Sequence, residues 1–259
     1  MCQCFTLRKS SVLAEPVWRT APWAHATKNR EKILLDHGFS LASLLEQADK
    51  LAKAGTHDGP STSRLQLLLQ IMKSSLELNR TLDQFRDDYL TQPKSPLYEE
   101  PGSSVSTAGE QSVKPDATVM DLDLLMMQWW TIKWLLAFTS NRLAVKAGEV
   151  VDRLPPPARS PIQSLIAQLE AYSSDAAREC IGHSILASIQ TALRRNIGRF
   201  WLSRTVFPLT TAIFQFCRSK PELEICRGLK NEISGQAGFR FATGIDVQPE
   251  LERVFIEHA

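Results

Sequence analysis

The 259-residue sequence lacks the features that are typical of membrane-spanning and secreted proteins. Its most apolar run, Leu124–Phe138, is interrupted by Lys133 and is shorter than the roughly 18 uncharged residues expected of a membrane span. Its first residues lack the long apolar core of a secretory signal peptide. Its five cysteines are odd in number and scattered, so they do not indicate a disulfide framework. These absences favour a soluble protein with no membrane contact, in a reducing intracellular compartment.

The sequence also lacks an excess of one charge and the glycine-rich loops that hold nucleotides. The 30 basic side chains are nearly balanced by 28 acidic ones, for a formal net charge of +2. That balance gives no global electrostatic reason to expect binding to nucleic acid or to an anionic membrane. Neither G-x-G-x-x-G nor G-x-x-x-x-G-K-[ST] occurs, so no phosphate-binding loop is predicted.

Alternation with a period of two is rare, whereas apolar residues recur at helical spacing along nearly the whole chain. Hydrophobic residues make up 43% of the sequence, which is ample for a core. We therefore predict an all-α fold, a bundle of roughly seven to nine helices that forms a single domain over residues 1–259. The main helices are expected near residues 34–51, 62–90, 121–151, 160–170, 174–193, 206–217 and 219–235.

One segment interrupts this pattern, at residues 92–118. It contains four prolines, two glycines and many serines. A segment of this composition cannot bury enough apolar surface to offset the entropy lost on ordering. We predict that residues 92–118 form a long flexible loop between an N-terminal and a C-terminal half.

The helix expected over residues 121–151 is apolar on almost all sides, which is typical of a central helix covered by several neighbours. It carries a cluster of aromatic residues: Trp129, Trp130, Trp134 and Phe138. A cavity lined by these four is the best candidate for an effector or partner surface. Plain core packing explains the same residues and is the favoured interpretation.

Cys180 and His183 lie three positions apart, so they share one face of a predicted helix. A nucleophile beside a general base would have this spacing. Their neighbours are apolar and no nearby acid is evident to orient the imidazole, which favours a small buried thiol beside a core histidine. No catalytic residue, metal ligand or cofactor is predicted for this chain.

For two other groups of residues, a structural interpretation is favoured over a functional one. Cys2 and Cys4 are too few for a structural zinc site, which needs four ligands. A basic run interleaved with two aromatic residues could contact nucleic acid or direct nuclear import, but arginines at a helix end also complement the helix dipole. The run consists of Arg194, Arg195, Arg199 and Arg204, with Phe200 and Trp201.

Seven short motifs occur in a characteristic order along most of the chain. They are Glu15–Trp23 (EPVWRTAPW), Leu34–Leu51, Ser95–Tyr98 (SPLY), Ala176–Ile181 (AARECI), Phe207–Leu209 (FPL), Glu224–Cys226 (EIC) and Gly238–Phe241 (GFRF). Together they resemble the regulatory region of fungal binuclear zinc-cluster transcription factors. Isoleucine stands at position 225, where that family usually has tryptophan. The motif positions look structural and offer no active-site residue.

The resemblance implies a nuclear regulatory protein, with the cytoplasm as the alternative location. The family reads DNA through an N-terminal module of six cysteines and two zinc ions, which this sequence lacks, so direct DNA binding is not expected. The expected partners are other regulatory proteins, a second copy of the chain or a small-molecule effector. A connection with a secondary-metabolite gene cluster is a family-level expectation. The alternatives are a helical enzyme or small-molecule-binding protein of secondary metabolism, built around Cys180 and His183, and a helical scaffold or dimerisation protein.

Overall fold

The computed structural model describes residues 15–20, 27–53, 62–90, 117–152, 154–195 and 202–237, and every regular element in these ranges is a helix. The prediction of an all-α fold is confirmed. Six helices are long: α3 (Arg30–Lys53), α4 (Thr62–Tyr89), α5 (Ala117–Val151), α6 (Pro156–Ser173), α7 (Asp175–Arg194) and α10 (Lys220–Ala237). Three elements are short: α2 (Pro16–Thr20), the 3-10 helix η3 (Ser203–Thr205) and α9 (Val206–Gln215). Among the described residues, the six long helices are slightly fewer than the seven to nine expected, and the segment near residue 206 forms a helix of only ten residues.

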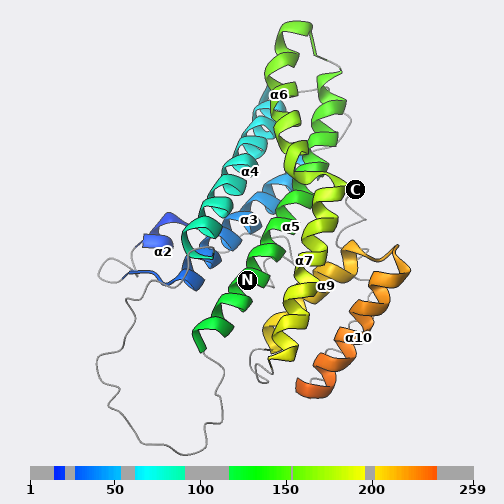
Figure 1. The fold of residues 1–259 in the computed structure, drawn as a ribbon. Coiled ribbons are helices and arrows are strands. Elements are labelled where there is room, and N and C mark those ends of the chain that lie inside the picture. Colours follow the sequence, from blue (N-terminus) through cyan, green and yellow to red (C-terminus); the bar gives the residue numbers. More distant parts are fainter. Residues whose placement is uncertain are drawn as a thin grey trace, which may run out of the picture.

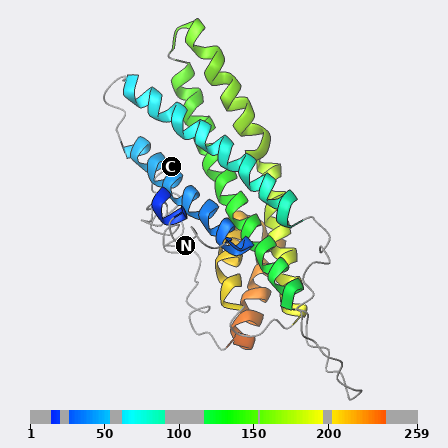
Figure 2. The same cartoon turned by 90° about the vertical axis from the view of Figure 1, so that its left-hand side faces the viewer.

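Helix α5 is the centre of the architecture. It is 35 residues long and packs against α3, α4, α6, α7 and α9. Helices α6 and α7 together run back along its length in the opposite direction (Figure 1). Helices α3 and α4 form an antiparallel pair on another side, and α9 and α10 cover the lower part of α7 (Figure 2). A single hydrophobic cluster includes side chains from all six long helices.

The boundary between α5 and α6 lies at the proline-rich segment. Pro155 is the residue before α6 and Pro156 opens it, where the absent N–H costs no hydrogen bond. The sequence instead suggested a start at Ser160, but Pro161 lies inside the helix. Arg159 secures the junction: its Nε donates to the Leu154 carbonyl at 2.6 Å. Helix α6 therefore begins at Pro156, four residues before the predicted start at Ser160.

The boundary between α6 and α7 was predicted correctly. Ser174 precedes α7, and its Oγ accepts a hydrogen bond from the Ala177 N–H at 3.2 Å. Asp175 in the first turn complements the positive end of the helix dipole.

At α10, Ser219 donates to the Glu222 carboxylate, and this hydrogen bond lowers the pKa of Glu222. Gly235, expected to end α10, lies within it.

Several expectations fall outside the described residues. These are the Cys2–Cys4 pair, the Ser95–Tyr98 and Gly238–Phe241 motifs, the residues Arg199, Phe200 and Trp201, and the predicted loop over 92–116. Helix α5 begins at Ala117, so the last two residues of the expected loop 92–118 are helical.

Within the described ranges, no helix combines the length and the apolar character needed to span a bilayer. The single-domain assignment over 1–259 stays a prediction.

Helix α7 approaches the end of α9 closely at Gly182. A Cβ atom at this position would lie 2.9 Å from the Phe216 ring and 3.0 Å from Cγ of Gln215. Real Cβ atoms do not approach neighbours this closely, so a side chain would force the helices apart. Glycine costs helix stability, and at this position it allows α9 to pack against α7.

We predict that Gly182→Ala destabilises the protein by about 1–3 kcal/mol through overpacking against Phe216. Gly228→Ala is the matched control, because nothing lies within 4 Å of a Cβ at that exposed position of α10. It should gain roughly 0.8–1 kcal/mol of helix propensity. Urea unfolding monitored by circular dichroism measures both changes. A Gly182→Ala protein as stable as Gly228→Ala would contradict the proposed packing.

Candidate functional site

The four aromatic residues predicted as a candidate surface form two pairs along α5. Trp129 and Trp130 meet edge to face with ring centroids 4.5 Å apart. Trp134 and Phe138 stack at 5.3 Å. Trp129 and Trp134 are each 1% exposed, whereas Trp130 and Phe138 are half-buried. Each pair thus has one member in the core and one that reaches the surface, and the two pairs have different neighbours.

Trp129 joins α5 to α4. Its Nε1–H donates to the Leu82 carbonyl at 2.7 Å. This bond satisfies the one polar group of a buried indole. Two cations lie near the same ring, with Arg86 Cζ and Lys133 Nζ each 5.6 Å from its centroid. The indole therefore packs in the core and also faces a group of charged residues between the two helices.

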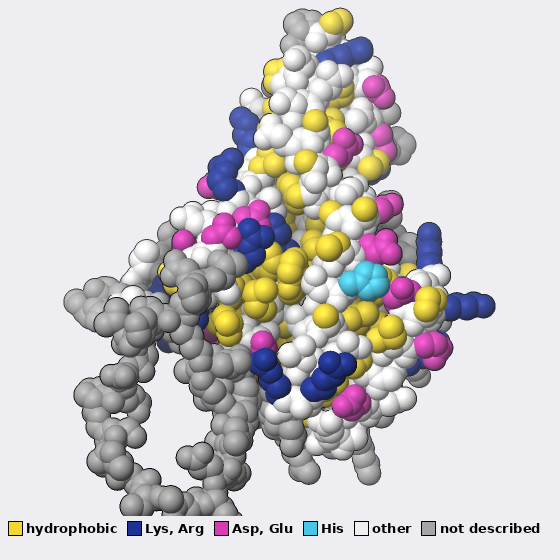
Figure 3. Space-filling model, viewed as in Figure 1, with side chains coloured by type: hydrophobic (Ala, Val, Ile, Leu, Met, Phe, Trp, Pro, Cys, Tyr) yellow, Lys and Arg dark blue, Asp and Glu magenta, His cyan; other side chains and the backbone are white. Residues whose placement is uncertain are grey.

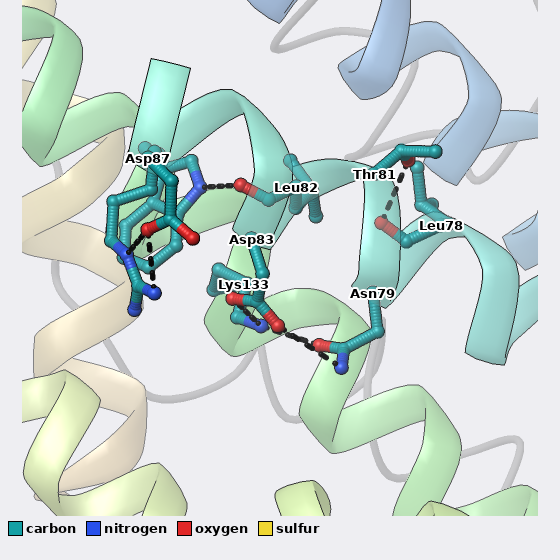
Figure 4. Close-up of polar contacts among 9 residues, drawn as sticks. Leu78, Asn79, Thr81, Leu82, Asp83, Asp87 and Lys133 are labelled. Atoms are coloured by element: carbon teal, nitrogen blue, oxygen red, sulfur yellow. Dashed lines mark hydrogen bonds and ion pairs between the residues drawn. The ribbon is translucent and has the colours of Figure 1, made fainter. Parts of the chain in front are cut away.

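Lys133 is the centre of that charged group. Its Nζ donates to Asn79 and to Oδ1 of Asp83, the latter at 2.9 Å, so the ammonium bridges two positions one turn apart on α4 (Figure 4). Its side chain is only 10% exposed, against 38% for Asp83. Burial lowers the pKa of Lys133, and the hydrogen bond and charge of Asp83 oppose that shift. The lysine that interrupts the apolar run is a buried, paired cation.

Three hydroxyl groups meet beside this cluster, one from each of α4, α5 and α6. Oγ of Ser75 and Oγ of Ser140 are 2.5 Å apart, and the hydroxyl of Tyr172 lies 3.1 Å from the first and 2.7 Å from the second. Each hydroxyl can donate one bond and accept another. Burial raises the pKa of Tyr172. Lys133 Nζ lies 5.9 Å from the Tyr172 ring, so the two polar groups adjoin.

The second aromatic pair is completed by α9. The Phe214 ring meets Trp134 at 5.6 Å and Phe138 at 5.5 Å, both edge to face. The Nε1–H of Trp134 donates to the Gln215 side chain at 2.8 Å. Sequence patterns did not predict the contact between α5 and α9, because Trp134 and Gln215 are 81 residues apart and their contact depends on how two separate helices pack.

Two arginines approach the same cluster. Arg142 from α5 and Arg178 from α7 have their Cζ atoms 5.9 and 5.7 Å from the Phe138 centroid. Arg178 pairs with Asp175, whose side chain is 92% exposed. Within the described part of the chain, two buried side-chain atoms make no hydrogen bond, Nε of Arg178 and Oγ of Ser173. Both lie at the junction of α6 and α7.

The expected burial of Cys180 and His183 is wrong. Both are exposed on α7, because the stripe that faces the core is made by Ile181, Ile185 and Ile189. The imidazole Nε2 of His183 lies 3.9 Å from the Glu179 carboxylate, an acid one turn away that sequence reasoning missed.

The Phe216 ring lies 4.8 Å from the His183 ring. Of the described cysteines, Cys226 is the buried one, and burial raises its pKa to about 11. Among the described residues, no group of three or more His, Cys, Asp or Glu side chains is arranged to hold a metal ion.

The basic run forms ion pairs where it is described. Arg195, at the end of α7, pairs with Asp123 near the start of α5. Arg204 in η3 pairs with Glu31 of α3 at 2.7 Å. Arg194 is exposed in the last turn of α7, where a cation complements the helix dipole. These contacts agree with the interpretation that the arginines of the basic run stabilise helix ends.

Comparison with protein-family models, with curated proteins and with solved structures finds no match to this chain. The resemblance to fungal transcription regulators, the absence of catalysis and the nuclear location therefore stay predictions.

Removal of the Asp83 carboxylate should cost more stability than removal of the Lys133 ammonium. In Asp83→Ala the buried Lys133 ammonium loses its charged partner, whereas in Lys133→Met the Asp83 carboxylate can be hydrated. We expect Asp83→Ala to lower the free energy of unfolding by about 1–3 kcal/mol and Lys133→Met to be neutral or stabilising. Asp87→Ala, on the same helix and 61% exposed, is the control. Urea unfolding distinguishes them, and a larger loss in Lys133→Met than in Asp83→Ala would be contrary evidence.

The same cluster predicts a pH dependence. The folded pKa of Lys133 lies below the ordinary 10.5. Between these two values the unfolded state binds more protons, so the contribution of Lys133 to stability rises with pH across that window. The unfolding free energy of wild type minus that of Lys133→Met should therefore increase as the pH approaches 10.5. Tyr172 contributes a pH dependence of the opposite sign, but both proteins contain Tyr172, so its contribution cancels in the difference. A difference that stays constant or decreases with pH would contradict the lowered pKa of Lys133 in the folded state.

Proposed function

We propose that this chain is a non-catalytic helical regulatory module that influences transcription through contacts with other proteins or with a small-molecule effector. The ordered motifs that resemble fungal regulators support this role. A half-buried apolar stripe on the outside of α5 also supports it, since aromatic and methionine side chains that reach the surface are available to a partner. The nucleus is the proposed location, with the cytoplasm as the alternative.

The stripe consists of Leu122, Met126 and Trp130, which follow one another at intervals of four residues and so share one side of α5. All three are only partly buried, whereas the neighbouring Trp129 is 1% exposed. Tyr89, at the end of neighbouring α4, is 36% exposed. In the view of Figure 3, hydrophobic side chains gather in the middle of the molecule, next to Lys, Arg, Asp and Glu side chains.

This combination is typical of a protein-contact surface. Aromatic residues and methionine are enriched at interfaces, and tryptophan is the commonest energetic anchor among them. A rim of charged groups gives orientation and specificity around such an anchor. Trp130 is therefore the residue on which the proposed contact depends most, and it carries the proposal. The partners are other regulatory proteins or a second copy of the chain, and DNA itself is not proposed as a ligand.

The proposal is tested by fusing the chain to an unrelated DNA-binding module and measuring transcription from a reporter that carries the matching operator. We expect the fusion to change reporter output relative to the module alone. Trp130→Ser combined with Met126→Ser should abolish most of that change, because loss of an interface anchor lowers affinity by roughly tenfold or more. Val145→Ser is the control, since Val145 is 57% exposed elsewhere on α5.

The comparison requires equal nuclear abundance and equal helical content of the three fusions. A folded wild-type fusion with no effect on the reporter would contradict the regulatory role. An effect that Val145→Ser removes as fully as the double variant would contradict the assignment to Trp130 and Met126.

A further inference from the structure

We propose that Ser160, near the start of α6, is phosphorylated by a proline-directed serine/threonine kinase that reaches it when the first turn of the helix unwinds. Within the proposed function, this modification is a regulatory input. The inference rests on that function only for its biological meaning, because phosphorylation itself is independent of any effect on transcription.

The acceptor serine and the proline after it are accessible. Ser160 and Pro161 are both exposed, whereas Ile162, the next residue, is 3% exposed. The turn between α5 and α6 lies at the upper end of the molecule in Figure 1, far from α10. An enzyme can therefore approach Ser160 from outside the bundle. A serine followed directly by a proline is the pattern that proline-directed kinases recognise.

Few hydrogen bonds hold the start of α6. Pro155, the residue before the helix, provides no side-chain cap, and prolines occupy the first positions of the helix. Pro161 lacks the N–H that would donate to the carbonyl four residues earlier. A proline also disfavours the α conformation of the residue before it, which here is Ser160. The helical conformation of Ser160 is therefore imposed by the rest of α6, and local unwinding costs little.

Unwinding gives the kinase the backbone conformation that it needs. Protein kinases bind the residues around the acceptor serine in an extended form, toward which Pro161 biases Ser160. Arg159 opposes unwinding, because its Nε donates to the Leu154 carbonyl at 2.6 Å and its Nη2 to the Asp152 carbonyl at 3.4 Å. These two bonds hold the start of α6 against the end of α5, so they limit how often Ser160 becomes available.

The reaction transfers one phosphoryl group from ATP. Oγ of Ser160 attacks the γ-phosphorus, and the bond from that phosphorus to the β–γ bridging oxygen breaks. ADP leaves with the bonding electrons, and the hydroxyl proton passes to a carboxylate of the kinase. The product carries roughly −1.5 to −2 charges near the N-terminus of α6, where negative charge is favourable. The modified chain therefore stays folded, with the phosphate on its surface.

Phosphorylation of the purified full chain by a mitogen-activated protein kinase with Mg²⁺-ATP tests the site. We expect phosphate on Ser160, located by tandem mass spectrometry. Pro161→Ala should slow this modification at least about tenfold, because the kinase loses the residue that it recognises. Ser164 is the internal control, since it is exposed one turn further along α6 and is followed by Leu165. The spectra also separate Ser160 from Ser95, the other serine that precedes a proline.

A synthetic peptide of residues 154–166 separates recognition from unwinding, because it contains the same sequence without the bundle. Arg159→Gln is made in both the chain and the peptide, and the rate in the chain is divided by the rate in the peptide. We expect this ratio to rise about two- to tenfold, the fold-change that corresponds to one hydrogen bond. Arg80→Gln is the control in the chain, because Arg80 is 72% exposed on α4. Circular dichroism checks that each variant is folded.

A folded chain that stays unmodified while the peptide is phosphorylated would overturn the inference, and so would the absence of modification in both. Equal phosphorylation of Ser164, or a Pro161→Ala protein modified as fast as wild type, would overturn it too. A ratio that Arg159→Gln leaves unchanged would contradict the unwinding step. Failure here is distinguishable from failure of the regulatory role, since the reporter fusion responds to Trp130 and Met126 and the kinase assay to residues of α6.

Discussion

Helix α5 has to be covered on nearly every side, and the rest of the fold follows from that requirement. Burial of apolar surface contributes roughly 25 cal/mol per Å², and most of the middle of this helix is buried, with tryptophans that are 1% exposed at two positions. A helix of 35 residues is too long for one short partner, so α6 and α7 cover it in succession. The α3–α4 pair and α9 pack against other sides of the helix.

Polar groups decide how the covering helices are aligned along α5. The indole N–H groups of Trp129 and Trp134 reach α4 and the end of α9, and the ammonium of Lys133 reaches α4. A shift of either partner by one turn would leave these donors buried without acceptors, at a cost of about 1–3 kcal/mol each. Apolar packing alone tolerates such shifts far better. The hydrogen bonds thus favour the observed alignment of α4 and α9 along α5.

The sequence predicted the elements of this fold better than the contacts between them. Local signals were sufficient for the start of a helix near residue 174 and for a central helix around Trp129. They misplaced the start of α6, because a proline at its sixth position is unusual and Pro161 favoured a later start. They missed Asp83 as the partner of Lys133, although the lone lysine in an apolar run was visible. Pairing across 50 residues depends on how helices pack, which periodicity does not specify.

The three hydroxyl groups at the centre of the bundle also bear on how the protein folds. Ser75 and Tyr172 are separated by 97 residues, and Ser140 lies between them in the chain. Contacts so distant in sequence form only after a large loss of chain entropy. We therefore expect the hydrogen-bonded group to close late, after the transition state for folding, when α4, α5 and α6 are already together. Interactions of this kind leave the folding rate almost unchanged and instead slow unfolding, so they prolong the lifetime of the native state.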